Sequence, residues 1–246
     1  MLVNNIFKVV LLLLSAAFIA LEGLEYQLEA AAVSSFILIL LTVFYSRWTE
    51  KKSIYFIGFL VTFTIAHALS YMSWYTPVVG SGQTDYIYYL VNILYILAYV
   101  FLITRCLIEL SFKEIFTQLP VPIVILVILD VFCVILVTDT AQNALNFYEY
   151  TLEFFYNTVI MTLLSVAVIN YLYRNDNKSM LLLIGSICIV FSEVIQLAYY
   201  YILQDNNLGL IYSFFLVIAF LFFYLQSQLV FTGPEPAFTD EEYNNA

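Results

Sequence analysis

The sequence contains eight long runs of apolar residues, separated by short polar or Gly/Pro-containing breaks. A helix of roughly 20 mostly apolar residues can cross the hydrocarbon core of a membrane. With 63% hydrophobic and 11% charged residues, the chain also lacks the polar side chains that a water-exposed surface needs. We therefore predict an all-α fold, a polytopic transmembrane helical bundle. Its predicted spans are residues 6–24, 30–47, 53–75, 86–108, 119–138, 151–173, 179–203 and 208–230.

The positions of the eight Lys and Arg residues predict how the bundle is oriented. Cytoplasmic loops of membrane proteins carry an excess of these residues. With eight spans, all the basic residues fall on one side, and the opposite loops carry acidic residues without basic ones. We therefore predict that both termini are cytoplasmic and that the chain lies in the cytoplasmic (inner) cell membrane. The basic residues are Lys8, Arg47, Lys51, Lys52, Arg105, Lys113, Arg174 and Lys178.

The chain is predicted to form one transmembrane domain, residues 1–231, followed by an acidic cytoplasmic tail, residues 232–246. The first apolar run resembles a signal peptide, but we interpret it as the first span. A weak internal repeat relates residues 30–108 to residues 151–230, because Lys-Ser precedes an apolar stretch and a Gly in both. Each half then forms a four-span unit, and both units point the same way.

The composition argues against several classes of function. Eight Lys and Arg residues form no basic patch, so we do not expect a nucleic-acid partner. Cys106, Cys133 and Cys188 lie in or beside apolar runs, without a CxxC motif or a His/Cys cluster. We therefore predict no disulfide framework, no metal site and no cofactor.

Three ionisable residues lie inside predicted spans: His67, Asp130 and Glu193. Ionisable groups in hydrocarbon are costly, so each is a candidate functional residue. His67 and Glu193 lie the same number of residues beyond the start of their spans, which places them at one depth, away from the basic side. Asp130 lies near the middle of its span. Because a buried carboxylate needs a partner and His67 is the only imidazole in the chain, we expect His67 and Glu193 to be in contact.

Uncharged polar residues of other spans reach a similar depth. Asn92, Asn157 and Gln196 are predicted to lie in the same layer and could equally join helices by hydrogen bonds. Tyr71 and Tyr199 belong to an aromatic group near the non-cytoplasmic boundary. This group is either an interfacial belt or the lining of a site for an amphipathic ligand.

Two of the spans resemble helices of the lysoplasmalogenase-like (YhhN) family of eight-span membrane proteins. The family's F-x-G…F-x-x-A-H-x-x-Y helix is matched by Phe56-Ile-Gly58, Phe63, Ala66-His67 and Tyr71. Its G…F-x-x-S-D helix is matched by Gly185, Phe191 and Ser192-Glu193, with Glu in place of Asp. The resemblance covers about residues 30–230.

The resemblance implies hydrolysis of the vinyl ether bond of a membrane lysolipid by intramembrane acids. One acid of the family is missing, because residues 34–44 contain no carboxylate. Glu193 is then the implied acid or base, with His67 or Asp130 as its partner. The remaining implied roles are headgroup binding by Asn92, Asn157 and Gln196, and lipid contact by Tyr71 and Tyr199.

Two other functions stay open. The missing acid favours a non-catalytic membrane component, such as a sensor, a scaffold or a subunit with a membrane-protein partner. The repeat and the intramembrane ionisable groups also fit a transporter. However, no predicted span is broken by paired Gly or Pro near its middle, which is the usual sign of a transport site.

Overall fold

The structure is a computed structural model that describes residues 2–49, 52–77, 84–108, 110–203 and 205–230. These residues form nine helices and no strand, and eight of the helices are long and apolar enough to cross a membrane. The predicted all-α bundle with eight spans is therefore confirmed. The eight helices are α1 (Leu2–Gly23), α2 (Gln27–Trp48), α3 (Ile54–Ser73), α4 (Tyr86–Ile108), α6 (Pro120–Thr140), α7 (Phe147–Arg174), α8 (Asn177–Tyr201) and α9 (Asn206–Gln228).

Local sequence signals explain where the predicted boundaries differ. α7 begins at Phe147, four residues before the predicted start, because Asn146 forms a capping box with Glu149. The Asn146 side chain accepts from the Glu149 backbone N–H at 3.0 Å, and the Glu149 carboxylate accepts from the Asn146 N–H at 2.9 Å. A short helix, α5 (Phe112–Gln118), occupies what was predicted to be a polar break, and it buries Ile115.

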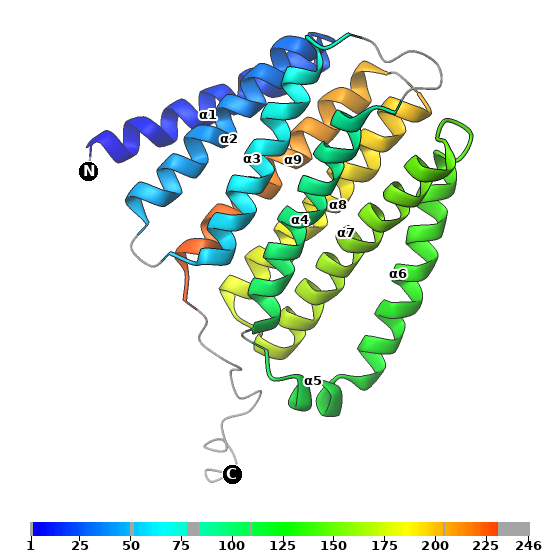
Figure 1. Ribbon diagram of the computed structural model, residues 1–246. Coiled ribbons are helices and arrows are strands. Elements are labelled where there is room, and N and C mark those ends of the chain that lie inside the picture. The colour runs from blue at the N-terminus through cyan, green and yellow to red at the C-terminus, as the bar shows by residue number, and fades with distance from the viewer. Residues whose placement is uncertain (1, 50–51, 78–83, 109, 204, 231–246) are drawn as a thin grey trace.

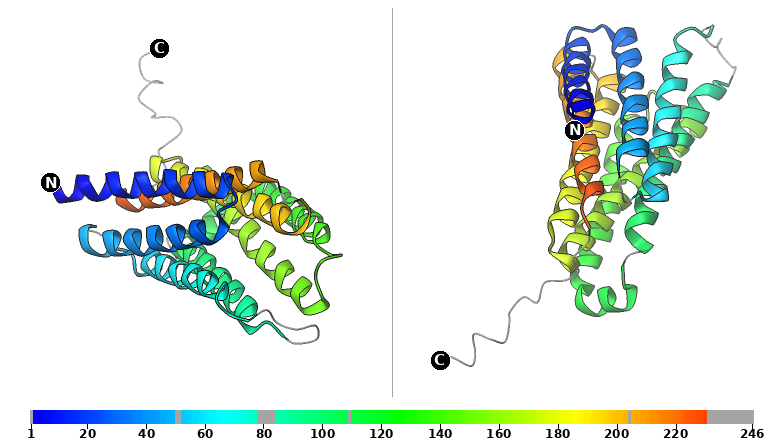
Figure 2. Two further views of the ribbon diagram at one scale, coloured as in Figure 1. Left: turned by 90° about the horizontal axis from the view of Figure 1, so that it is seen from above. Right: turned by 90° about the vertical axis from the view of Figure 1, so that its left-hand side faces the viewer.

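Seven of the long helices form a closed ring in the order α1, α2, α3, α4, α7, α8, α9 and back to α1. α1 and α9 lie side by side although they are at opposite ends of the sequence (Figures 1 and 2). α6 lies outside the ring against α7, and α5 connects α4 to α6 (Figure 1). The short connections between most helices make sequential neighbours antiparallel.

Aromatic side chains fill the middle of the ring. Phe59 and Phe63 of α3 face Phe220 of α9, with ring centroids 5.5 and 4.8 Å apart, and each is at most 7% exposed. Tyr99 of α4 packs against Phe63 at 5.8 Å, and Phe223 against Phe59 at 5.7 Å. Because lipid removes the hydrophobic drive between helices, close packing of this kind is what holds them together.

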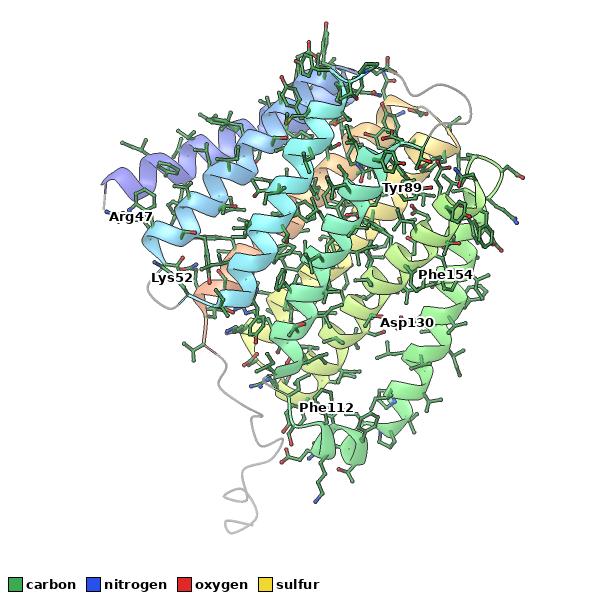
Figure 3. The ribbon with its side chains drawn as sticks, viewed as in Figure 1. Arg47, Lys52, Tyr89, Phe112, Asp130 and Phe154 are labelled. Atoms are coloured by element: carbon green, nitrogen blue, oxygen red, sulfur yellow. The ribbon has the colours of Figure 1, made fainter. Side chains whose placement is uncertain are left out.

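All seven described basic residues lie at one end of the bundle, which we call the basic end. It contains the connections from α2 to α3, from α4 to α6 and from α7 to α8, and Figure 3 shows Arg47 and Lys52 there. Arg105 is buried at this end with its guanidinium 5.0 Å above the Phe56 ring. Lys51 and the predicted acidic tail, residues 232–246, lie outside the described residues.

The predicted repeat and the cellular orientation stay predictions. α3 and α8, which carry the two similar segments, both begin at the basic end, as the repeat requires. The predicted orientation, with both termini in the cytoplasm, depends on the gathering of the basic residues at one end of the bundle.

The orientation can be tested with topology reporters. We expect alkaline phosphatase to be inactive when fused after residue 246 and active when fused within the α6–α7 connection, residues 141–146. The reason is that phosphatase matures only outside the cytoplasm, and the basic end should face inward. A green fluorescent protein fused at the same two sites should give the opposite result. Phosphatase activity at the C-terminal fusion would contradict the orientation.

Gly185 provides a test of the contact between α8 and α9. A Cβ atom at Gly185 would lie 2.7 Å from the ring of Phe223, which is fully buried and packed on Phe59. We expect Gly185→Ala to lower the free energy of unfolding by about 1–3 kcal/mol, because the ring cannot move without repacking the core. Unfolding in sodium dodecyl sulfate measures this value.

Gly58→Ala is the matched control for this variant. A Cβ atom at Gly58 would meet the ring of Phe101 at 3.1 Å, and Phe101 is only partly buried. That ring can shift, so we expect a clearly smaller loss of stability. Equal losses for the two variants would show that the α8–α9 contact is not unusually close.

Candidate functional site

A cavity of about 310 Å³ lies between α3, α4, α7 and α8, near the end of the bundle opposite the basic end. We call it the acidic cavity, because its lining includes the carboxyl groups of Asp85, Glu153 and Glu193. Asp85 is exposed, whereas Glu153 is buried and Glu193 is half-buried. The carboxyl groups thus follow a path from the surface into the membrane-spanning part of the bundle.

Glu193 of α8 is held by two tyrosine side chains, one from the adjacent helix α7 and one from α4. Tyr99 of α4 donates a hydrogen bond to its Oε1, and Tyr156 of α7 donates one to its Oε2 at 2.9 Å. Both tyrosines are buried, and both pack edge-on against each other at 6.1 Å. An ionised carboxylate only accepts hydrogen bonds, so two hydroxyl donors satisfy one lone pair on each oxygen and fix its position.

Glu153 lies one turn before Asn157 on α7, and both side chains line the acidic cavity. The Asn157 amide nitrogen is 3.3 Å from Glu153 Oε1 and 3.1 Å from Thr138 Oγ1 of α6, and it donates to both. Thr138 is fully buried, so this amide also joins α6 to the ring. Asn157 therefore positions the second buried carboxyl of the cavity.

The acidic cavity has an unbalanced charge. None of its described lining residues is Lys, Arg or His, so the described lining offers no cation to its three carboxyl groups. Five tyrosines also line it: Tyr88, Tyr95, Tyr156, Tyr200 and Tyr201. Aromatic faces and carboxylates both attract positive charge. The described residues contain no group of three His, Cys, Asp or Glu that could hold a metal ion.

Four of the residues singled out from the sequence come together in this cavity: Glu193, Asn92, Asn157 and Gln196. Asn92 donates from its amide nitrogen to the Tyr88 carbonyl at 2.9 Å, which is a bond within its own helix. The helical rise predicted that these residues lie at one depth in the membrane. The order of the helices around the ring places them in the same cavity.

The predicted contact between His67 and Glu193 is wrong. His67 Nδ1 lies 3.4 Å from Ser34 Oγ of α2, and its ring stacks on Phe63 at 5.1 Å. Tyr95 contacts the His67 ring edge-on at 5.5 Å and also lines the acidic cavity, so it stands between the two ionisable residues. α3 and α8 lie across the ring from each other, and equal depth does not bring their side chains together.

Asp130 is also outside the cavity. Its Oδ2 accepts a hydrogen bond from Ser165 Oγ at 2.7 Å, and Figure 3 shows it between α6 and α7. Because α6 lies outside the ring, this carboxyl faces α7 from the side away from Glu193. The structure therefore does not support Asp130 as the partner of Glu193.

The two tyrosines predicted to contact a lipid lie elsewhere as well. Tyr71 shares a hydrogen bond of 2.9 Å with Tyr75 beyond the end of α3. Tyr199 is 2% exposed, and its hydroxyl accepts from Gln27 Nε2 at 2.6 Å. Neither lines the acidic cavity. Tyr199 instead joins α8 to the start of α2.

Glu153 is the buried carboxyl of the acidic cavity that the sequence analysis did not single out. The predicted span began at residue 151, which placed Glu153 at the membrane boundary. α7 actually begins at Phe147, so Glu153 lies well inside the helix. The capping box at Asn146 and Glu149 was the signal that could have revealed this earlier start.

Comparisons of the chain with protein-family models, with curated proteins and with solved structures gave no match. The fold defines the class: this is an integral, multi-pass membrane protein. Within that class its distinguishing feature is the acidic, tyrosine-lined cavity inside the bundle. Function has to be argued from that site rather than from the fold.

A double-mutant cycle tests how Glu193 is held. We expect Tyr156→Phe and Glu193→Gln to be coupled by about 0.5–3 kcal/mol in the free energy of unfolding, because the two side chains share a hydrogen bond. The matched cycle of His67→Gln with Glu193→Gln should give a smaller coupling, since the structure forms no bond between them. A larger coupling for His67 than for Tyr156 would contradict the geometry of the site.

Proposed function

We propose that the protein is an intramembrane lipid hydrolase of the lysoplasmalogenase-like type, with Glu193 and Glu153 as its two catalytic carboxyl groups. The observation that carries this proposal is that both residues line one cavity, from the neighbouring helices α7 and α8. The resemblance of the α3 and α8 motifs supports the same class of activity. Glu153 supplies the second carboxyl that is missing from residues 34–44.

The lining of the cavity supports a lipid with a positively charged headgroup as the substrate. Three carboxyl groups and five tyrosines attract a cation, and Asn92, Asn157 and Gln196 add neutral hydrogen-bonding groups. A volume of about 310 Å³ is at the small end of ligand pockets, so it fits a headgroup rather than a whole lipid. The hydrocarbon chain of the substrate then lies outside the cavity.

The arrangement of carboxyl groups fits the hydrolysis of a vinyl ether. In the proposed first step, Glu153 donates a proton to the vinyl carbon that does not carry the ether oxygen. The resulting cation is stabilised by the Glu193 carboxylate. Glu193 then takes a proton from a water molecule as that water adds to the carbon bonded to the ether oxygen, which gives a hemiacetal.

The hemiacetal then collapses, and the carboxyl groups return to their starting forms. Glu193 gives its proton to the leaving ether oxygen, and Glu153 takes the proton of the hemiacetal hydroxyl. The products are the chain-free glycerophospho headgroup alcohol and a long-chain aldehyde, and one water molecule is consumed. The exposed position of Asp85 at the cavity supports access of that water.

Amide variants test this function. We expect Glu193→Gln and Glu153→Gln each to lower the rate of aldehyde release by about a hundredfold or more, because each removes a proton-transfer group. The measurement is mass spectrometry of ether lysolipids after incubation with the protein in lipid nanodiscs. Asp130→Asn is the matched control and should keep the wild-type rate, because Asp130 lies between α6 and α7.

Two results would overturn the proposed function. One is unchanged substrate with the wild-type protein at high loading. The other is an equal loss of activity in Asp130→Asn, which would remove the assignment of Glu153 as the partner of Glu193.

The bonds to Glu193 also favour a second function, the binding of a cationic lipid headgroup without hydrolysis. Both oxygens of Glu193 accept from buried tyrosines, which suits a fixed carboxylate that recognises charge. In a sensor or a subunit of a membrane complex, the wild-type protein would retain the lysolipid intact. Glu193→Gln would release it.

A further inference from the structure

A second cavity of about 310 Å³ lies between α1, α2 and α9, on the other side of the bundle from the acidic cavity. We call it the α1–α2–α9 groove. Apolar side chains of all three helices, such as Leu12, Leu38 and Leu221, form its walls. Lys8 is part of its lining, and so are Ser34 and His67. Among the described lining residues, only Lys8 is a lysine or an arginine.

The groove has the length of one membrane leaflet. Its lining on α1 extends from Lys8 to Phe18, which is about 15 Å at the rise of an α-helix. The hydrocarbon core of a bilayer is about 30 Å thick, so one leaflet contributes about half of that. The groove is therefore as long as the part of an acyl chain that lies within one leaflet.

The Lys8 end of the groove has the features of a membrane interface. Lys8 is exposed and belongs to the basic end of the bundle. Beside it, Phe7 packs against Trp48 at 5.1 Å, and Trp48 against Phe44 at 5.3 Å, where Phe44 is part of the groove lining. Tryptophan and exposed lysine are typical of the headgroup level of a bilayer. A lysine there attracts an anionic lipid headgroup.

The other end of the groove is closed by polar and aromatic contacts. Ser34 Oγ lies 3.4 Å from His67 Nδ1, so these polar groups are partners of each other. Phe63 and Tyr95 pack on the far side of the His67 ring, at 5.1 and 5.5 Å. This aromatic wall lies between the groove and the acidic cavity.

We propose that the α1–α2–α9 groove binds one acyl chain of an anionic glycerophospholipid from the leaflet at the basic end, with the lipid phosphate at Lys8. The apolar walls select a hydrocarbon chain, the length matches one leaflet, and the charge of Lys8 selects an anionic headgroup. A volume of about 310 Å³ accommodates a chain and is too narrow for a helix, whose diameter with side chains is about 10 Å. This site is independent of the proposed hydrolase activity.

Native mass spectrometry of the full-length protein tests this site. The protein is released from nanodiscs that contain equal amounts of phosphatidylglycerol and phosphatidylcholine, and the lipids that stay bound are counted. We expect the wild type to retain one phosphatidylglycerol. Lys8→Gln should weaken that retention about fivefold, since one lysine near a membrane surface contributes about that factor. Ser15→Phe should abolish retention, because Ser15 is part of the groove lining.

Two matched controls separate the groove from general effects. Ala16→Phe adds the same ring to an exposed position of α1 outside the groove lining, and Lys52→Gln removes a lysine from the same end of the bundle. Both should retain the lipid as the wild type does. The proposal is overturned if Ser15→Phe, folded by circular dichroism, still retains the lipid. It is also overturned if phosphatidylcholine is retained equally well, or if Lys8→Gln behaves as the wild type does.

Discussion

Hydrocarbon offers no hydrogen-bond partner to a polypeptide, and both the helices and the placement of their polar side chains follow from that constraint. Every backbone donor in a span has to be satisfied within the helix, which gives eight long helices in the described chain. Polar side chains meet the same restriction, and several of them are paired inside the bundle. Glu193 with Tyr99 and Tyr156, Asn157 with Thr138, and Asp130 with Ser165 are all bonds between different helices.

Aromatic side chains in the middle of the ring lie between the acidic cavity and the α1–α2–α9 groove. Phe59, Phe63 and Phe220 meet at the centre, and Tyr95 extends this wall toward His67. On one side of the wall, carboxyl groups and tyrosines line a cavity. On the other side, leucines and phenylalanines line a groove of similar volume. The same packing that stabilises the bundle thus keeps a polar site and an apolar site apart.

The basic and acidic residues of the bundle lie toward opposite ends. Basic residues lie at one end, and the acidic cavity lies near the other. A cationic group is attracted to the acidic cavity, whereas an anionic headgroup is attracted to the basic end at Lys8. Under the two proposals, the substrate headgroup comes from one face of the membrane and the lipid bound at Lys8 comes from the other.

The sequence by itself determined the class of fold, the number of spans and most of the helix boundaries, because these depend on the length and composition of each apolar run. It also placed Glu193, Asn92, Asn157 and Gln196 in one layer, because the helical rise converts position along a span into depth. It did not identify the partner of Glu193. His67 has the same depth but lies behind Tyr95, and Asp130 faces α7 from outside the ring.

Only the tertiary structure decided which side chains share a space. The order of helices around the ring places α7 beside α8, and therefore Glu153 in the same cavity as Glu193. The rotation of each helix about its axis turns Tyr71 and Tyr199 away from that cavity. Order and rotation result from the packing of side chains between helices, such as Gly185 against Phe223, and apolar sequences that are nearly uniform in composition do not encode that packing in any local pattern.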